Sequence, residues 1–108
     1  MISDKDEKAE VKHKSIASYF ADKVLKYKQQ DVKANRFTTE TTETFVTVQW
    51  LENCINKCCG GCGCNLTIDV DDNFKVESDI TAQRLDNSIP HYISNIIPMC
   101  INCNCSNK

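Results

Sequence analysis

Glycine, proline and long apolar runs are all scarce in this chain. Its 108 residues include three glycines, two prolines and one tryptophan, and each apolar run is only a few residues long. These features exclude collagen-like and coiled-coil proteins, and they exclude a transmembrane helix, which needs about 20 consecutive apolar residues. The formal charge of −2 is small. The length allows one domain with a small core.

Cysteine, by contrast, is abundant and clustered. Of the eight cysteines, none precedes Cys54, five lie between Cys54 and Cys64, and three lie between Cys100 and Cys105. The opening sequence MISDKDEKAE lacks the basic start and apolar stretch of a signal peptide. We therefore expect a reducing intracellular compartment, cytoplasm or nucleus, where disulfides are rare. Cysteines this close together suit a metal ion better than a disulfide framework.

Two C-x2-C pairs stand thirty-seven residues apart and predict one structural zinc site. A tight turn in each pair brings two thiolates within about 2.3 Å of the same ion. We expect Gly60 and Gly61, inside the first pair, to supply left-handed backbone conformations for that turn. The four expected zinc ligands are Cys59, Cys62, Cys100 and Cys103.

The other four cysteines exceed the needs of one zinc ion. Cys54 falls on an expected helix and is interpreted as a small core residue. Cys64 and Cys105 each follow a C-x2-C pair by two positions, so we expect them to pack against it. Cys58 and Cys64 also offer competing ligand registers with Cys62. A second metal bound by these four remaining cysteines is the alternative.

The first third of the chain predicts one long amphipathic helix over 7–34. Apolar side chains recur there at helical spacing from Ile16 to Tyr27. Residues 1–36 carry nine Lys or Arg against six Asp or Glu, whereas the remainder carries four against nine. A basic leader helix before a zinc module can contact phosphates, and an ordinary solvated face is the alternative.

The rest of the chain predicts short elements around the cysteines, in an α+β fold. We divide it into a basic leader helix and linker at 1–46 and a helix plus zinc-knuckle domain at 47–108. The expected elements are a loop over 35–44, a helix capped by Thr47 with a strand as the alternative, a hairpin from 66–70 that returns through 74–76 and 80–85, and a short helix or turn over 92–97 stopped by Pro98.

Four motifs follow one another along the chain: C-x2-C-G-C-x-L from Cys59, R-L-D-N from Arg84, H-x3-N from His91, and C-x2-C-N from Cys100. In this order they resemble the zinc-knuckle branch of the HNH endonuclease family, also called His-Me finger or ββα-metal. The resemblance covers Cys59 to Asn104, about half the chain. The leader only faintly resembles those of small viral and mobile-element members. The fold that the resemblance implies is N-terminal helices followed by a zinc-stabilised ββα-metal finger. We expect its closing helix to be short or missing, because only five residues follow Cys103.

The resemblance also implies roles for individual residues. Asn95 stands where the family has an asparagine that orients the hairpin, and Asn104 stands where it has a His or Asn ligand for the catalytic ion. Gln83-Arg84 replaces the Asp-His pair of the best-known branch, which serves as metal ligand and base. His91 is then the substitute base, unless it only holds its loop by hydrogen bonds, and Asp86 is the substitute ligand. Arg84 is suited to holding a phosphate.

The function that the resemblance implies is an endonuclease that hydrolyses phosphodiester bonds of nucleic acid, preferably DNA, with Mg²⁺ or Mn²⁺ beside the structural Zn²⁺. Arginine cannot act as a base at neutral pH, and a neutral amide is a weaker Mg²⁺ ligand than a carboxylate. The alternative is therefore a catalytically inactive zinc-binding module for nucleic-acid or protein interaction. Binding without cleavage would separate these alternatives.

Overall fold

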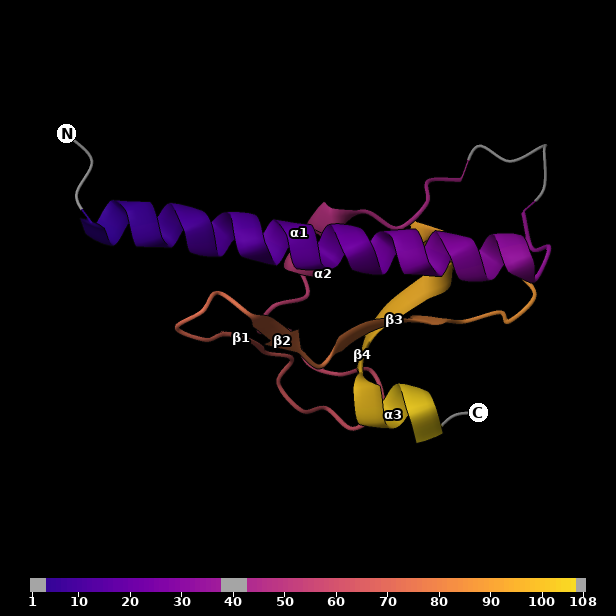
Figure 1. The fold of residues 1–108 in the computed structure, drawn as a ribbon. Helices are drawn as coiled ribbons and strands as arrows, with labels where there is room; N and C mark the ends of the chain where they lie inside the picture. The colour runs from indigo at the N-terminus through magenta and orange to yellow at the C-terminus, as the bar shows by residue number, and fades with distance from the viewer. Residues whose placement is uncertain (1–3, 38–42, 107–108) are drawn as a thin grey trace.

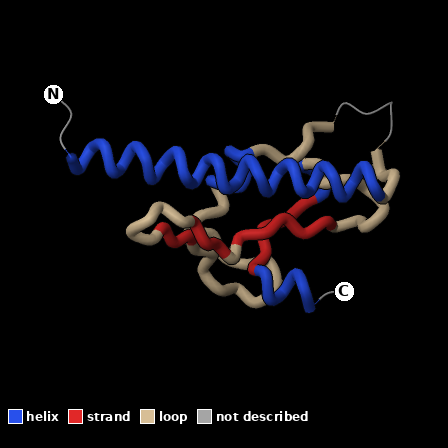
Figure 2. The backbone as a smooth tube through the Cα atoms, in the orientation of Figure 1, coloured by secondary structure: helices blue, strands red, loops and turns tan. Residues whose placement is uncertain are grey.

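The chain has the mixed α+β architecture that the sequence predicts. A computed structural model describes residues 4–37 and 43–106, with side chains described between Lys8 and Asn104. One long helix runs along one side of two small antiparallel sheets, and a short helix lies on the opposite side of them (Figure 1). Much of the remaining chain is loop (Figure 2). The elements are α1 (Asp4–Lys33), α2 (Val48–Glu52), β1 (Ile68–Val70), β2 (Val76–Ser78), β3 (Ile80–Arg84), the 3₁₀ turn η1 (Ile93–Asn95), β4 (Ile96–Cys100) and α3 (Ile101–Ser106).

The long leader helix expected over 7–34 is confirmed as α1. Its apolar stripe faces the rest of the chain, where Phe20 and Tyr27 are buried. Beyond the last turn, Asn35 adopts a left-handed backbone conformation with φ of 57°. Asparagine tolerates this conformation better than most residues, and it is a common way to end a helix.

The second helix is also confirmed, and the alternative of a strand there is wrong. The Trp50 amide donates a hydrogen bond to the Thr47 hydroxyl at 3.1 Å, which caps α2 as expected. Leu51 is completely buried beneath this turn of helix. The loop expected over 35–44 is described only at its two ends, because residues 38–42 lie outside the described part of the chain.

The hairpin after the first cysteine cluster is confirmed as β1 and β2, with Ile68 opposite Ser78. Asp71 shapes its turn because one carboxylate oxygen accepts the backbone amides of Asn73 and Lys75, at 2.8 and 2.9 Å. Such side-chain to backbone bonds are typical of aspartate in turns.

The pairing of β3 corrects the sequence prediction. β3 leaves the hairpin and pairs with β4, so that Arg84 lies opposite Ile96. Of the helix or turn expected over 92–97, only the 3₁₀ turn η1 forms. Pro98 does not end the segment as expected, because the chain continues as the strand β4 through it. Pro98 fits there because it lies opposite Ala82, whose amide hydrogen bonds to the Tyr27 hydroxyl of α1 instead of to β4.

One buried cluster joins α1 to the rest of the chain. Phe20 of α1, Leu51, Leu66 and Ile80 are each 0% exposed and belong to this cluster. The closing helix, which we expected to be short or missing, is present as the short α3, which begins at Ile101 and includes Cys103. Within the described ranges, no helix is long and apolar enough to cross a membrane. The core therefore fixes α1 beside β3, and residues of both elements line the site described next.

Candidate metal centre and basic cleft

The four cysteines of the two C-x2-C pairs meet in space, as expected. Their sulfur atoms all lie within 4.8 Å of one another. The Sγ atoms of Cys62 and Cys100 are 3.9 Å apart. Four sulfurs arranged tetrahedrally at about 2.3 Å from one ion are about 3.8 Å apart. The cluster therefore fits one tetrahedral metal ion, joining the loop before β1 to the end of β4 and the start of α3.

Backbone amides directed at the sulfurs favour the thiolate forms that a metal needs. Cys59 Sγ accepts hydrogen bonds from the amides of Cys100 at 3.2 Å and Gly61 at 3.3 Å. The Cys100 amide is the largest cause that lowers the pKa of the Cys59 thiol, and burial opposes it. The amide of Cys64 likewise lowers the pKa of Cys62. Such partners beyond the ligands orient them and stabilise their charge.

The glycines in and beside the first C-x2-C pair, Cys59 to Cys62, do not have the backbone conformations that we expected. The left-handed glycine is Gly63, with φ of 78°, and neither Gly60 nor Gly61 has positive φ. Glycine is needed at both positions because neighbouring atoms leave no room for a side chain. A Cβ on Gly61 would lie 3.0 Å from the Cβ and Sγ of Cys103, and one on Gly60 would lie 2.9 Å from Ile97 Cδ1. These close approaches let the loop reach β4 and α3.

The remaining cysteines are placed separately. Cys54 is 2% exposed and belongs to the core, as predicted, and its thiol lies 3.2 Å from the Trp50 carbonyl. Cys58 is exposed. Cys64 is exposed too, but its thiol interacts with those of Cys62 and Cys100, which raise its pKa. The side chain of Cys105 lies outside the described ones. No second group of three metal-binding side chains forms among the described residues.

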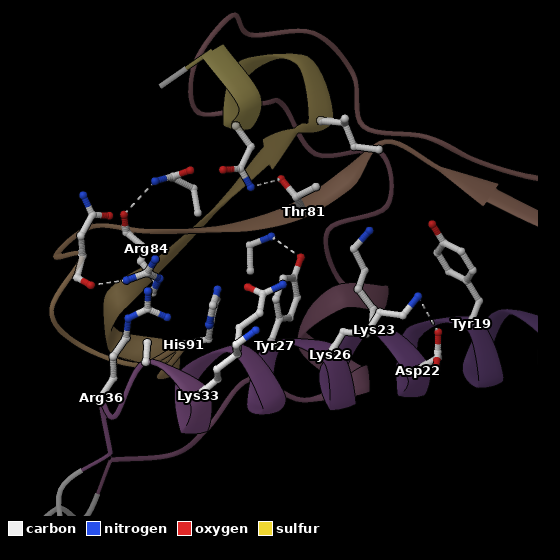
Figure 3. Close-up of a pocket in the computed structure, with 17 residues that line it drawn as sticks. Tyr19, Asp22, Lys23, Lys26, Tyr27, Lys33, Arg36, Thr81, Arg84 and His91 are labelled. Carbon is white, nitrogen blue, oxygen red and sulfur yellow. Dashed lines mark hydrogen bonds and ion pairs between the residues drawn. The ribbon is translucent and has the colours of Figure 1, made fainter. Parts of the chain in front are cut away.

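A basic cleft of about 900 Å³ lies between α1 on one side and β3 and α3 on the other (Figure 3). Lys23, Lys26 and Lys33 project from α1. Of the described residues that line the cleft, one is a carboxylate, Asp22, which pairs with Lys26 at 3.1 Å. The pKa of Lys23 is lowered, first by burial and then by Lys26. The five cations that line the cleft are Lys23, Lys26, Lys33, Arg36 and Arg84.

Arg84 and Arg36 bring two guanidinium groups to one end of the cleft, beside His91 (Figure 3). Arg84 Nη1 donates to the carbonyl of Asn87, which holds the side chain across the loop after β3. Its pKa is lowered, first by burial and then by the charge of Arg36. Two arginines held close together are a concentrated site for an anion, since each offers planar paired donors.

Neutral side chains form the wall beside α3. The Asn104 amide group donates to Thr81 Oγ1 at 3.0 Å, and the Thr81 hydroxyl donates to the Met99 carbonyl at 2.6 Å. Gln83 also lines the cleft, and its amide group donates to the Arg84 carbonyl at 3.1 Å. Asn104, the metal ligand that the resemblance implies, thus lines the cleft together with Gln83. Neither of these two side chains is a carboxylate.

His91 is buried and bound to a residue that sequence reasoning missed. Its ring Nδ1 and its backbone amide each lie 2.8 Å from the same oxygen of Asp31, near the end of α1. The other oxygen of Asp31 accepts a hydrogen bond from Arg36 at 2.9 Å, and the Tyr27 ring stacks on the imidazole with centroids 4.4 Å apart. No pattern marked Asp31, because a lone aspartate on a polar helix resembles a solvated residue.

Asn95 and Asp86 lie in the loop between β3 and β4, and neither lines the cleft. The Asn95 amide group donates to the carbonyls of Asp86, Ile89 and Pro90, at 3.1 to 3.2 Å, and its oxygen accepts the Asp86 amide at 3.0 Å. The carboxylate of Asp86 accepts the amide and hydroxyl of Ser88. The structure thus brings Arg84, His91 and Asn104 together in one cleft and uses Asn95 and Asp86 to shape the neighbouring loop.

Comparison with protein-family models, with curated proteins and with solved structures finds no match for this chain. The chemistry of the cysteine cluster and of the basic cleft is therefore the basis for assigning a function.

Proposed function

We propose that this chain is a zinc-stabilised, HNH-like nucleic-acid-binding module that holds a phosphodiester backbone in its basic cleft. The observation that carries the proposal is the gathering of five cations around one cleft in a chain whose net charge is −2. Nucleic-acid backbones bind chiefly through lysine and arginine contacts to phosphate.

The arrangement of these cations favours an anionic ligand. Among the described residues that line the cleft, Asp22 is the one carboxylate, and it is paired with Lys26, while Arg36 is paired with the buried Asp31. Burial, and then the charge of Lys26, disfavours the charged form of Lys23, and burial and then Arg36 do the same for Arg84. A phosphate placed among these groups would favour their charged forms and offset the repulsion between neighbouring cations.

The order of elements supports the HNH likeness. The two strands β3 and β4 and the helix α3 follow one another, and the cysteine cluster closes at the junction of β4 and α3. Four thiolates in tetrahedral spacing are the donor set typical of structural zinc, and they leave no open position for water. We therefore assign zinc a structural role, tested by metal analysis of the purified chain, with one zinc per chain expected and a different metal as the contradicting result.

Metal-assisted hydrolysis, the activity that the resemblance implies, has weaker support than phosphate binding. Gln83 and Asn104 offer neutral amides, and hard divalent ions prefer charged oxygens. Five nearby cations also repel Mg²⁺. We expect intact plasmid DNA after incubation with Mg²⁺ or Mn²⁺, and metal-dependent cleavage would restore the endonuclease as the primary function.

Binding is tested by fluorescence anisotropy with labelled single-stranded and duplex oligonucleotides over a series of salt concentrations. Removing one cation that binds a phosphate should reduce the slope of log affinity against log salt by about 0.7 to 0.9. We expect such a reduction for Arg84→Gln and for Arg36→Gln. Lys28→Gln is the matched control, because Lys28 is exposed on α1 and does not line the cleft.

Two results would contradict the proposal. The first is an absence of binding to every oligonucleotide at low salt, which would favour a protein-interaction module. The second is an equal effect of Lys28→Gln and Arg84→Gln, which would mean that overall charge, and not the cleft, determines binding.

A further inference from the structure

The pair of Asp31 and His91 has a geometry that phosphate binding does not require. Asp31 is 0% exposed and His91 is 4% exposed, yet His91 lines the cleft. Because Asp31 is bound to Nδ1 of the imidazole, the proton of a neutral ring lies on Nδ1 and the lone pair lies on Nε2. This is the orientation in which a carboxylate prepares a histidine to accept a proton.

Nε2 is available to a bound ligand. The described residues provide no hydrogen-bond partner for it, and none of their buried side-chain nitrogens or oxygens lacks a partner. Nε2 is therefore not fully sealed from solvent, and its ring lines the cleft. Burial is the largest cause that lowers the pKa of His91, with Arg84 and Arg36 adding to it and Asp31 opposing it. The ring is consequently a neutral proton acceptor at pH 7.

The groups that face His91 suit chemistry on a phosphate. Arg36 and Arg84 approach it from the end of α1 and from β3, Asp31 lies at its Nδ1, and Tyr27 stacks on its face. A phosphate held by the two arginines would lie in the cleft that His91 also lines. Fixed guanidinium donors in a partly buried site also stabilise the charge that develops when a phosphate is attacked.

We propose that the cleft cleaves single-stranded RNA by internal transesterification, with His91 as the general base and Asp31 as its positioning residue. This inference rests on the proposed binding of a phosphodiester backbone. RNA is the matching substrate because its 2′-hydroxyl supplies a nucleophile next to the phosphate, which requires no metal-bound water. A cleft of about 900 Å³ lies in the size range of small-ligand sites, which suits a few nucleotides of a single strand.

The step balances without an added cofactor. His91 Nε2 takes the proton of a ribose 2′-hydroxyl, the 2′-oxygen bonds to the adjacent phosphorus, and the bond from phosphorus to the 5′-oxygen breaks. The departing 5′-oxygen takes a proton from water, and the imidazolium returns its proton to the resulting hydroxide. The products are a 2′,3′-cyclic phosphate and a 5′-hydroxyl, and His91 ends neutral.

The first test compares two substrates with the zinc-loaded chain in buffer free of other divalent ions. One is a labelled single-stranded RNA and the other is the all-deoxy strand of the same sequence. We expect the RNA to be cut to fragments ending in 2′,3′-cyclic phosphate and the deoxy strand to be bound but intact. Equal cutting of both strands, RNA that is bound and stays uncut from pH 5 to 9, or binding of the deoxy strand without binding of RNA would overturn the inference. Absence of binding to both strands would overturn the proposed function itself.

The second test uses variants prepared identically. His91→Asn retains a donor for Asp31 and should slow cleavage on the order of 100-fold or more, with RNA affinity unchanged. Asp31→Asn should slow cleavage and move the acidic limb of the pH–rate profile to lower pH, because the carboxylate raises the pKa of His91. Lys28→Gln should cleave normally. Cleavage by His91→Asn at the normal rate would refute the role of His91, and the substrate comparison decides the proposal if a variant fails to fold.

Discussion

One oxygen of the Asp31 carboxylate accepts hydrogen bonds from both the backbone amide and the ring Nδ1 of His91, each at 2.8 Å, across sixty positions of sequence. The other oxygen binds Arg36 at 2.9 Å. A single buried carboxylate thus joins the end of α1 to the loop between β3 and β4. It places Arg36 and His91 in the same cleft, so the geometry of the candidate site depends on the packing of α1 against the rest of the chain.

Replacing Asp31 should destabilise the fold strongly. Asp31→Ala leaves the amide and ring of His91 and the guanidinium of Arg36 without their shared acceptor, and removing one partner of a buried charged pair costs about 3 to 5 kcal/mol. Urea denaturation of the zinc-loaded chain measures this decrease in stability. Asp22→Ala is the control, because its pair with Lys26 is solvent-exposed and such helical pairs contribute about 0.3 to 0.5 kcal/mol. Similar decreases for both variants would mean that the Asp31 network contributes little.

Stability should fall as the pH is lowered. The pKa of His91 is lowered below its ordinary value of 6.5, chiefly by burial, so the unfolded chain binds the proton first and stability declines below about pH 6.5. For Asp31, burial alone would raise the pKa. Hydrogen bonds from His91 and Arg36 outweigh it and lower the pKa below 3.8, so a second decline begins near that value. Thermal melting between pH 8 and 5 should show the first decline, and His91→Asn should flatten it. An unchanged slope in that variant would assign the decline to other groups.

Much of the scaffold could be predicted from local sequence patterns. The four-cysteine cluster followed from the spacing of Cys59, Cys62, Cys100 and Cys103, because a C-x2-C turn constrains its own geometry. The helix α1 followed from apolar periodicity, and the N-cap of α2 followed from one hydroxyl at Thr47. Each of these features depends on residues that are neighbours in sequence or that share one ion.

The features that could not be predicted from the sequence depend on contacts between residues that are far apart along the chain. β3 pairs with β4 because the intervening loop is held by Asn95, whereas β3 alone resembles a continuation of the preceding hairpin. The role of Asp31 could not be predicted, because it depends on the packing of α1 against that loop. The roles of Gly60 and Gly61 were missed for the same reason, since their neighbours Ile97 and Cys103 come from the far end of the chain.

Removing the metal should unfold the part of the chain that follows α2. Structural zinc in zinc-finger peptides contributes about 10 to 16 kcal/mol of apparent binding energy, which is comparable to the about 5 to 15 kcal/mol that stabilises a typical domain. We expect a chelator, or Cys100→Ser, to abolish the cooperative melt in circular dichroism. Cys58→Ser is the control because Cys58 is exposed and lies outside the four-sulfur cluster. A melt that chelation leaves unchanged would contradict a structural metal.

Gly61→Ala should weaken metal binding while leaving all four ligands in place. The added Cβ would lie 3.0 Å from both the Cβ and the Sγ of Cys103, so the thiolate would have to move away from its position around the ion. Gly63→Ala is the matched control: its φ of 78° strains any side chain, but an added Cβ meets no atom within 4 Å. In competition with a chromogenic chelator, Gly61→Ala should therefore release zinc at lower chelator concentration than Gly63→Ala, although both variants melt at lower temperature than the parent chain. If Gly63→Ala released zinc as readily, general destabilisation and not contact with Cys103 would explain the effect.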